Sequence, residues 1–148
     1  MKAFHFRLDQ ALRWRATQRD LEKSRVSVAA KRLQDLREEI DRRREEITAG
    51  ARQLPSSGTT GTSLAAWNGF TEQLRRRIRS LEASAAAAEQ ELEVRLQALT
   101  EANRRVQLLE NLRQTAHGNW KAEFNRELET AAGEFFLFRL QSRDRMGA

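Results

Sequence analysis

The sequence predicts an all-α fold, a long antiparallel hairpin of two helices that pack as a coiled coil. Apolar residues recur at spacings of three and four, the pattern of helices that bury one narrow stripe against each other. The intervening residues are mainly Arg, Glu, Gln and Ala, which favour helix formation. With 39% hydrophobic and 32% charged residues, a compact multilayer core is not expected. We therefore expect residues 1–148 to form one coiled-coil hairpin.

The first helix is expected from about Phe4 to Leu54. Its apolar seam is continuous from Val26 to Leu54 and is interrupted by polar residues between Arg15 and Glu22. The helix is expected to end where the single proline of the chain follows the seam, because proline cannot continue a helix.

A turn is expected over residues 55–63, which read Pro-Ser-Ser-Gly-Thr-Thr-Gly-Thr-Ser. The glycines permit positive φ angles, and the hydroxyl side chains favour turns and caps. Thr62 or Ser63 is expected to cap the second helix. A turn at this place makes the helices antiparallel, and it predicts these facing residues: Ile40 with Ile78, Leu33 with Ala85, Val26 with Leu92, and Leu12 with Val106.

The second helix is expected from about Leu64 to about Arg145, and Gly118 and Gly133 are the positions where a bend or break is expected. Its seam consists of Leu74, Ile78, Leu81, Ala85, Ala88, Leu92, Leu99, Ala102, Val106 and Leu109. Because the first helix is shorter, about thirty residues of the second, from about residue 115, are expected to extend beyond its end.

This overhang has an apolar stripe of its own, formed by Trp120, Phe124, Leu128, Ala131, Phe135 and Phe138. An apolar stripe without a partner in the chain is a binding surface or a segment that folds back. Three alternatives are open: packing of Phe135 and Phe138 on Phe4 and Phe6, pairing of the tails of two molecules, or a different partner protein.

No catalytic, cofactor or metal site is expected, so the protein is not expected to be an enzyme. Catalysis needs reactive groups gathered in a concave site, and two paired helices offer little concavity. His5 and His117 are expected near each other at the open end, but two histidines without carboxylates are a weak metal pattern. The absence of cysteine excludes disulfides and thiolate metal sites.

The net charge of +6 is interleaved along both helices, which is typical of a solvated coiled-coil surface. We therefore expect no nucleic-acid partner, although a nucleic-acid or membrane-surface binder remains an alternative. An arginine collar, Arg42–Arg44 with Arg75–Arg77 and Arg79, is expected near the turn. Arg43 falls on the seam, where its stem is expected to pack while its head reaches solvent. No signal peptide or membrane-spanning run is evident, which predicts a soluble cytoplasmic protein.

Two motifs resemble those of FliJ proteins of the bacterial flagellar export apparatus. They are Phe4-x-Phe6-x-Leu8-x-x-x-Leu12-x-x-Arg15 at the start of the chain, and Trp67-Asn68-Gly69-Phe70-x-x-x-Leu74-x-x-x-Ile78 after the turn. The resemblance implies a coiled coil similar to the central stalk of the rotary ATP synthase. It implies binding to the hexameric flagellar export ATPase, to the cytoplasmic domain of the export gate and to export chaperones. The implied location is cytoplasmic and peripheral at the inner membrane, with a role in flagellar biogenesis and so in motility and chemotaxis.

The resemblance also implies which residues meet the gate, and the two-ended hairpin leads us to expect the ATPase at the other end. Near the turn, the positions that correspond to gate-binding residues are Leu36, Ile40, Ile47, Phe70, Leu74 and Leu81, joined by Arg75, Arg76 and Arg77. At the open end, the residues expected to bind the ATPase are Phe4, Phe6, Trp120, Phe124, Leu128, Phe135 and Phe138.

The alternatives to this function are a stalk protein of a virulence-type secretion system, a generic coiled-coil scaffold without an export role, and an export chaperone whose substrate binds the tail stripe.

Overall fold

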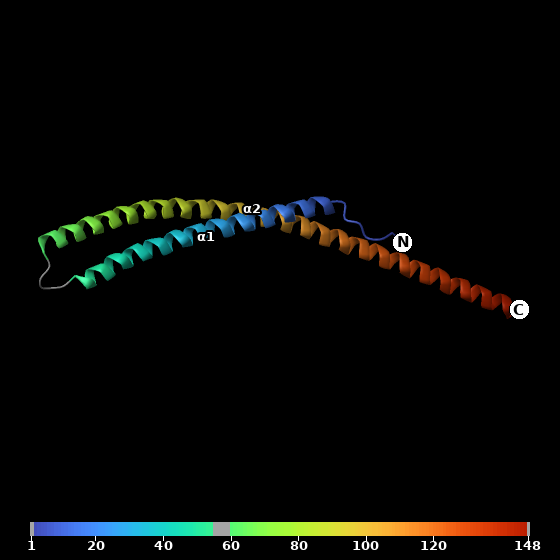
Figure 1. Cartoon of the computed structure of the whole chain (residues 1–148). Coiled ribbons are helices and arrows are strands. Elements are labelled where there is room, and N and C mark those ends of the chain that lie inside the picture. Colours follow the sequence, from blue (N-terminus) through green and yellow to red (C-terminus); the bar gives the residue numbers. More distant parts are fainter. Residues whose placement is uncertain (1, 55–59, 148) are drawn as a thin grey trace. The chain divides into compact units, whose positions relative to one another are not determined.

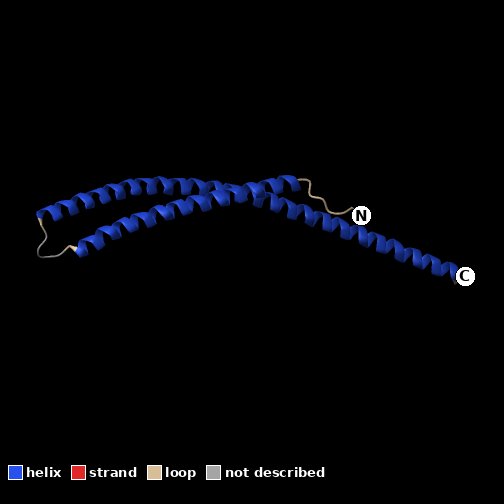
Figure 2. Cartoon of the chain, viewed as in Figure 1, coloured by secondary structure: helices blue, strands red, loops and turns tan. Residues whose placement is uncertain are grey.

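The computed structural model describes residues 2–54 and 60–147, which form two α-helices (Figure 1). Helix α1 spans Asp9–Gln53 and helix α2 spans Gly61–Met146, with 45 and 86 residues. The described part of the chain contains no strand (Figure 2). The predicted all-α helical hairpin is thereby confirmed. Helix α2 continues through Gly118 and Gly133, so neither glycine breaks it.

The structure corrects the expected start of the first helix, because α1 begins at Asp9 and not at about Phe4. The Leu8 carbonyl accepts the N–H of Leu12 at 2.9 Å, which is the first helical hydrogen bond. The Asp9 carboxylate lies in the first turn, where the helix dipole favours a negative charge, and pairs with Arg13 at 3.0 Å. Residues 2–6 precede the helix as a non-helical segment.

The start of α2 lies at Gly61, slightly before the expected Leu64. Thr60 caps it, in place of Thr62 or Ser63: its Oγ1 accepts the N–H of Ser63 at 3.2 Å, and its carbonyl accepts the N–H of Leu64 at 3.1 Å. Residues 55–59 of the expected turn lie outside the described residues.

The chain divides into two compact units, each containing a part of both helices. The hairpin unit is Gln18–Ala102, and the terminal unit combines Met1–Thr17 with Asn103–Ala148. On α1 the division falls inside the stretch from Arg15 to Glu22 where polar residues interrupt the apolar seam.

The hairpin unit has an apolar core along the predicted seam. The core contains Leu33, Ile40, Ile78, Leu81, Ala85 and Ala88, and Leu36, Ile47 and Leu92 pack against it. The predicted partners Ile40 and Ile78 therefore share one core, as do Leu33 and Ala85. Ion pairs flank the seam and run in antiparallel order: Arg44 with Glu82 at 2.8 Å, Arg37 with Glu89, and Arg32 with Glu91 at 3.8 Å.

The terminal unit has a second core that includes the non-helical segment. Phe6, Leu12 and Val106 are buried there, so the predicted pairing of Leu12 and Val106 places both in one core. Phe4, Leu109 and Ala116 pack against them. Because Phe6 precedes α1, the segment before the helix covers a part of α2 that α1 does not reach.

Near the turn, Trp67 of α2 packs against the backbone of α1 at Gly50. A Cβ atom at Gly50 would lie 2.2 Å from the end of the Trp67 ring, a distance that no side chain tolerates without movement. The ring of Trp67 also lies 5.9 Å from that of Phe70. The absence of a side chain at Gly50 therefore lets an aromatic residue close this end of the helix pair.

We expect Gly50→Ala to lower the free energy of unfolding by about 1 kcal/mol, because a displaced Trp67 ring loses its packing. The matched control is Gly69→Ala, which meets nothing within 4 Å. It should raise stability by about 0.5–1 kcal/mol through helix propensity alone. Urea unfolding followed by circular dichroism measures both changes. Equal stabilisation by the two substitutions would contradict the packing role of Gly50.

Candidate protein-binding surfaces

An aromatic stack in the terminal unit joins the N-terminal segment to α2. The Phe4 ring lies edge-on to His117 at 4.9 Å and 5.8 Å from Trp120, whose ring in turn lies 5.2 Å from Phe124. The Trp120 Nε1–H donates a hydrogen bond to the Lys2 carbonyl at 3.2 Å. Four residues of this stack region, Phe4, Phe6, Trp120 and Phe124, belong to the expected ATPase-binding set. Phe6 is buried and the other three are half-buried. Much of the surface of these four side chains is therefore already covered by contacts within the chain.

Beyond Phe124 the apolar side chains of α2 are exposed. Leu128, Phe135 and Phe138 are 44%, 64% and 67% exposed. The alternative in which Phe135 and Phe138 fold back onto Phe4 and Phe6 is therefore wrong. The reason is that α2 remains helical to Met146, which carries these residues away from the N-terminal segment.

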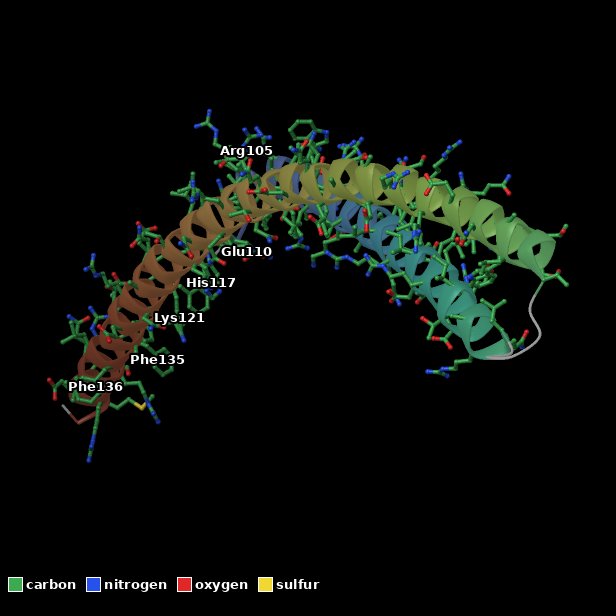
Figure 3. All side chains as sticks on the ribbon, turned by 90° about the vertical axis from the view of Figure 1, so that its left-hand side faces the viewer. Arg105, Glu110, His117, Lys121, Phe135 and Phe136 are labelled. Atoms are coloured by element: carbon green, nitrogen blue, oxygen red, sulfur yellow. The ribbon has the colours of Figure 1, made fainter. Side chains whose placement is uncertain are left out.

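The segment Phe135–Phe138 is apolar on every side. Phe136 and Leu137 are 63% and 61% exposed, and Figure 3 labels Phe135 and Phe136 near the end of α2. Successive residues on a helix are turned by about 100°, so this Phe-Phe-Leu-Phe run covers the whole circumference. The spacing of three and four residues along the apolar stripe includes Phe135 and Phe138 but not Phe136 and Leu137. The unbroken apolar run is the signal that identifies them. A helix that is apolar all round is normally enclosed by other protein.

In the hairpin unit, the expected gate-binding residues separate into two groups. Ile40 and Leu81 are buried in the core, and Leu36, Ile47 and Leu74 are half-buried. Of these five, Leu36, Ile40, Ile47 and Leu81 belong to or pack against the core between the helices. Phe70, which is 46% exposed, and Arg75, Arg76 and Arg77 present their side chains to solvent.

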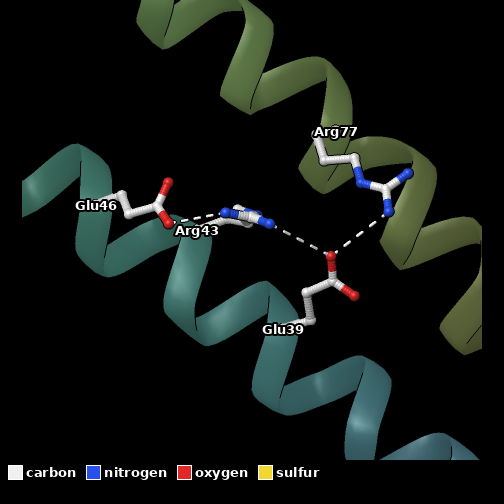
Figure 4. A network of polar contacts seen from close by, with 4 residues as sticks. All are labelled: Glu39, Arg43, Glu46 and Arg77. Atoms are coloured by element: carbon white, nitrogen blue, oxygen red, sulfur yellow. Dashed lines mark hydrogen bonds and ion pairs between the residues drawn. The ribbon is translucent and has the colours of Figure 1, made fainter.

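Five of the seven arginines of the collar form ion pairs with acidic neighbours. Arg43 lies between Glu39 at 3.7 Å and Glu46 at 2.8 Å, and Glu39 also pairs with Arg77 at 3.5 Å (Figure 4). The Arg43 side chain is 35% exposed, so its stem packs while its head reaches these carboxylates, as predicted for a seam position.

A second carboxylate in the collar is shared by two more arginines. Glu72 accepts hydrogen bonds from Arg79 at 3.3 Å and Arg76 at 3.4 Å, and these bonds hold the pKa of Glu72 below its usual range. Within the described residues, Arg42 and Arg75 have no ion-pair partner. The cations left for an acidic partner are therefore fewer than the sequence suggests.

The described residues contain no cluster of three metal-binding side chains. At the open end, the rings that lie against His117 are those of Phe4 and Trp120, and His5 is exposed. In the same described part of the chain, no helix has a stretch long and apolar enough to cross a membrane.

Comparison with known proteins identifies one family. The family model described as Flagellar FliJ protein matches residues 4–139, nearly the whole chain. No curated protein and no solved structure shows a significant match to the chain.

We expect Phe4→Ala to release the N-terminal segment, because it removes the ring contacts to His117 and Trp120. Amide hydrogen exchange of residues 2–8 should become faster while that of the middle of α1 is unchanged. The control Phe138→Ala removes an exposed ring and should leave the exchange of residues 2–8 as in the wild type. Unchanged exchange in the Phe4 variant would show that the stack does not hold the segment.

Proposed function

The chain belongs to the FliJ family and is a component of the flagellar export apparatus, and on this premise we propose that it is a stalk linking two export proteins. The proposed partners are the hexameric export ATPase and the cytoplasmic domain of the export gate. Members of this family are not enzymes, and the proposed role requires only binding. The match to the flagellar family favours this role over that of a virulence-type stalk or a generic scaffold.

The proposed ATPase-binding element is the exposed end of α2. Its support is the Phe135–Phe138 segment, whose side chains are apolar on every side of one helix. A single partner helix covers one face of such a segment, whereas a ring covers all faces at once. A hexameric ATPase with a central pore is a partner of that shape. Leu128 extends the same apolar surface toward Phe124.

The proposed gate-binding element lies on α2 near the turn. Phe70 is exposed, and Arg77 follows it by seven residues and so lies on the same side of the helix. Arg75 has no ion-pair partner among the described residues, which leaves its charge for an acidic group. Leu36, Ile40, Ile47 and Leu81 support this element from the core, where they hold the two helices together. Leu74 is half-buried and lies between Phe70 and Leu81 on α2.

A helix pair that binds different proteins at different places is suited to coupling them, because packed helices resist bending more than a loop does. Such coupling would let the ATPase act on the gate and would assist the delivery of export chaperones and their substrates. The proposed location is the cytoplasmic face of the inner membrane, reached through binding to the gate.

We expect the double substitution Phe135→Ser/Phe138→Ser to weaken binding to the export ATPase at least about tenfold, since each enclosed aromatic contributes about 1–3 kcal/mol. The matched control is Leu108→Ser/Leu112→Ser, which changes two exposed apolar residues of the same helix. Surface plasmon resonance with the purified ATPase measures both. Equal affinities for the two variants would remove the end of α2 from the ATPase contact.

We expect Phe70→Ser to weaken binding to the cytoplasmic domain of the gate, with binding to the ATPase unchanged. Leu96→Ser is the control, because Leu96 is on the same helix and is 45% exposed, almost as much as Phe70. Charge reversal of Arg75–Arg77 should have the same selective effect. Loss of ATPase binding instead of gate binding would reverse the proposed assignment of the two elements.

A further inference from the structure

The exposed ring of Phe70 rests against a second aromatic ring of α2. The ring centroids of Phe70 and Trp67 lie 5.9 Å apart, and the ring planes are inclined by 40°. Aromatic rings at this separation attract each other beyond the effect of the area that they bury. Phe70 is exposed, whereas Trp67 is half-buried. Trp67 therefore limits the orientations of the Phe70 ring and leaves much of that ring open to a partner.

The Trp67 ring is in turn held by α1, at Gly50. The far edge of the indole, atoms Cη2 and Cζ3, lies so close to Gly50 that a Cβ atom there would be 2.2 and 2.3 Å away. These two atoms belong to a rigid ring, so a side chain at position 50 would displace the whole Trp67 side chain. By contrast, a Cβ atom at Gly69, on the same helix as Trp67, would meet nothing within 4 Å.

The backbone of α1 does not itself require a glycine at position 50. The φ angle of Gly50 is outside the left-handed region, and the residue lies three positions before Gln53, the last residue of α1. It is therefore not the left-handed glycine that caps many helices, and alanine is the better residue inside a helix. What this position does require is the absence of a side chain, because the Trp67 ring occupies that space.

Helix α1 holds a second residue of the proposed gate-binding element. The Arg77 guanidinium lies 3.5 Å from the carboxylate of Glu39 on α1 (Figure 4). Phe70 and Arg77 are seven residues apart and so share one side of α2. The element lies on α2, but α1 positions it at two places, through Gly50 and through Glu39.

We propose that Gly50 and Trp67 are positioning residues, which hold the Phe70 ring in the orientation in which the export gate binds it. This inference rests on the proposed role of Phe70. It adds two residues that the expected gate-binding set does not contain, one of them on the other helix. A ring that is already oriented loses less rotational freedom on binding. The surface of the gate that fits is an apolar pocket for the open side of one aromatic ring.

The test measures binding of the full-length protein to the purified cytoplasmic domain of the gate by surface plasmon resonance. We expect Gly50→Ala to weaken this binding about three- to tenfold, which corresponds to the cost of ordering one side chain. Affinity for the export ATPase should not change. The control Ala51→Gly loosens the same turn of α1 at an exposed position and places no atom against Trp67. It should bind the gate as the wild type does.

A double-substitution cycle asks whether Gly50 acts through Trp67. Phenylalanine lacks the two ring atoms that a side chain at position 50 would meet. In the Trp67→Phe background, Gly50→Ala should therefore leave gate affinity unchanged. A measurement without the gate follows the ring contact itself: nuclear Overhauser effects between the rings of Trp67 and Phe70 should be present in the wild type and in Ala51→Gly, and lost in Gly50→Ala.

Three results would overturn the positioning role while the proposed function stands. They are wild-type gate affinity in Gly50→Ala when Phe70→Ser binds weakly, equal weakening by Gly50→Ala and Ala51→Gly, and an undiminished effect of Gly50→Ala in the Trp67→Phe background. If the wild-type protein does not bind the gate domain, the proposed gate contact is wrong, and the positioning role is wrong with it.

Discussion

The structure depends on a mismatch in length between its two helices. Helix α2 has 86 residues and α1 has 45, so α1 covers only part of the apolar surface that α2 presents. The N-terminal segment extends this cover as far as Trp120, through Phe4 and Phe6. Past Phe124 the apolar side chains of α2 have no cover among the described residues. The surface offered to other proteins therefore begins where the intrachain partner ends.

Within each unit, the apolar seam accounts for more of the stability than the ion pairs do. Exposed ion pairs such as Arg44 with Glu82 contribute about 0–1 kcal/mol each, whereas complete burial of a side chain such as Ile40 contributes about 1.5–3 kcal/mol. The charges have a different use. The acidic residues pair with most arginines of the collar. They thereby distinguish Arg75, which has no ion-pair partner in the described structure, from Arg77, which shares Glu39 with Arg43.

The fold was predictable from the sequence because spacing alone specifies a helical seam. The predicted partners Ile40 and Ile78 share a core because a turn of known position fixes which residues face each other. The start of α1 was not predictable in this way, since the Phe4-x-Phe6 pattern fits a helix as well as the non-helical segment that forms. The site was predictable in part: Phe70 and Phe135 are exposed as a binding role requires, whereas Ile40 and Leu81 are in the core. The spacing of apolar residues shows that they lie on one face of a helix. It does not show whether another segment of the chain packs against that face.

The contact between Lys2 and Trp120 spans 118 residues of sequence and has a consequence for biosynthesis. The N-terminal segment leaves the ribosome first, but its partners on α2 are translated near the end of the chain. The hairpin unit has its complete core by Ala102, so it can fold while translation continues. Phe4 and Phe6 remain without their partners until later, and a nascent-chain chaperone that binds aromatic segments has this interval in which to act on them.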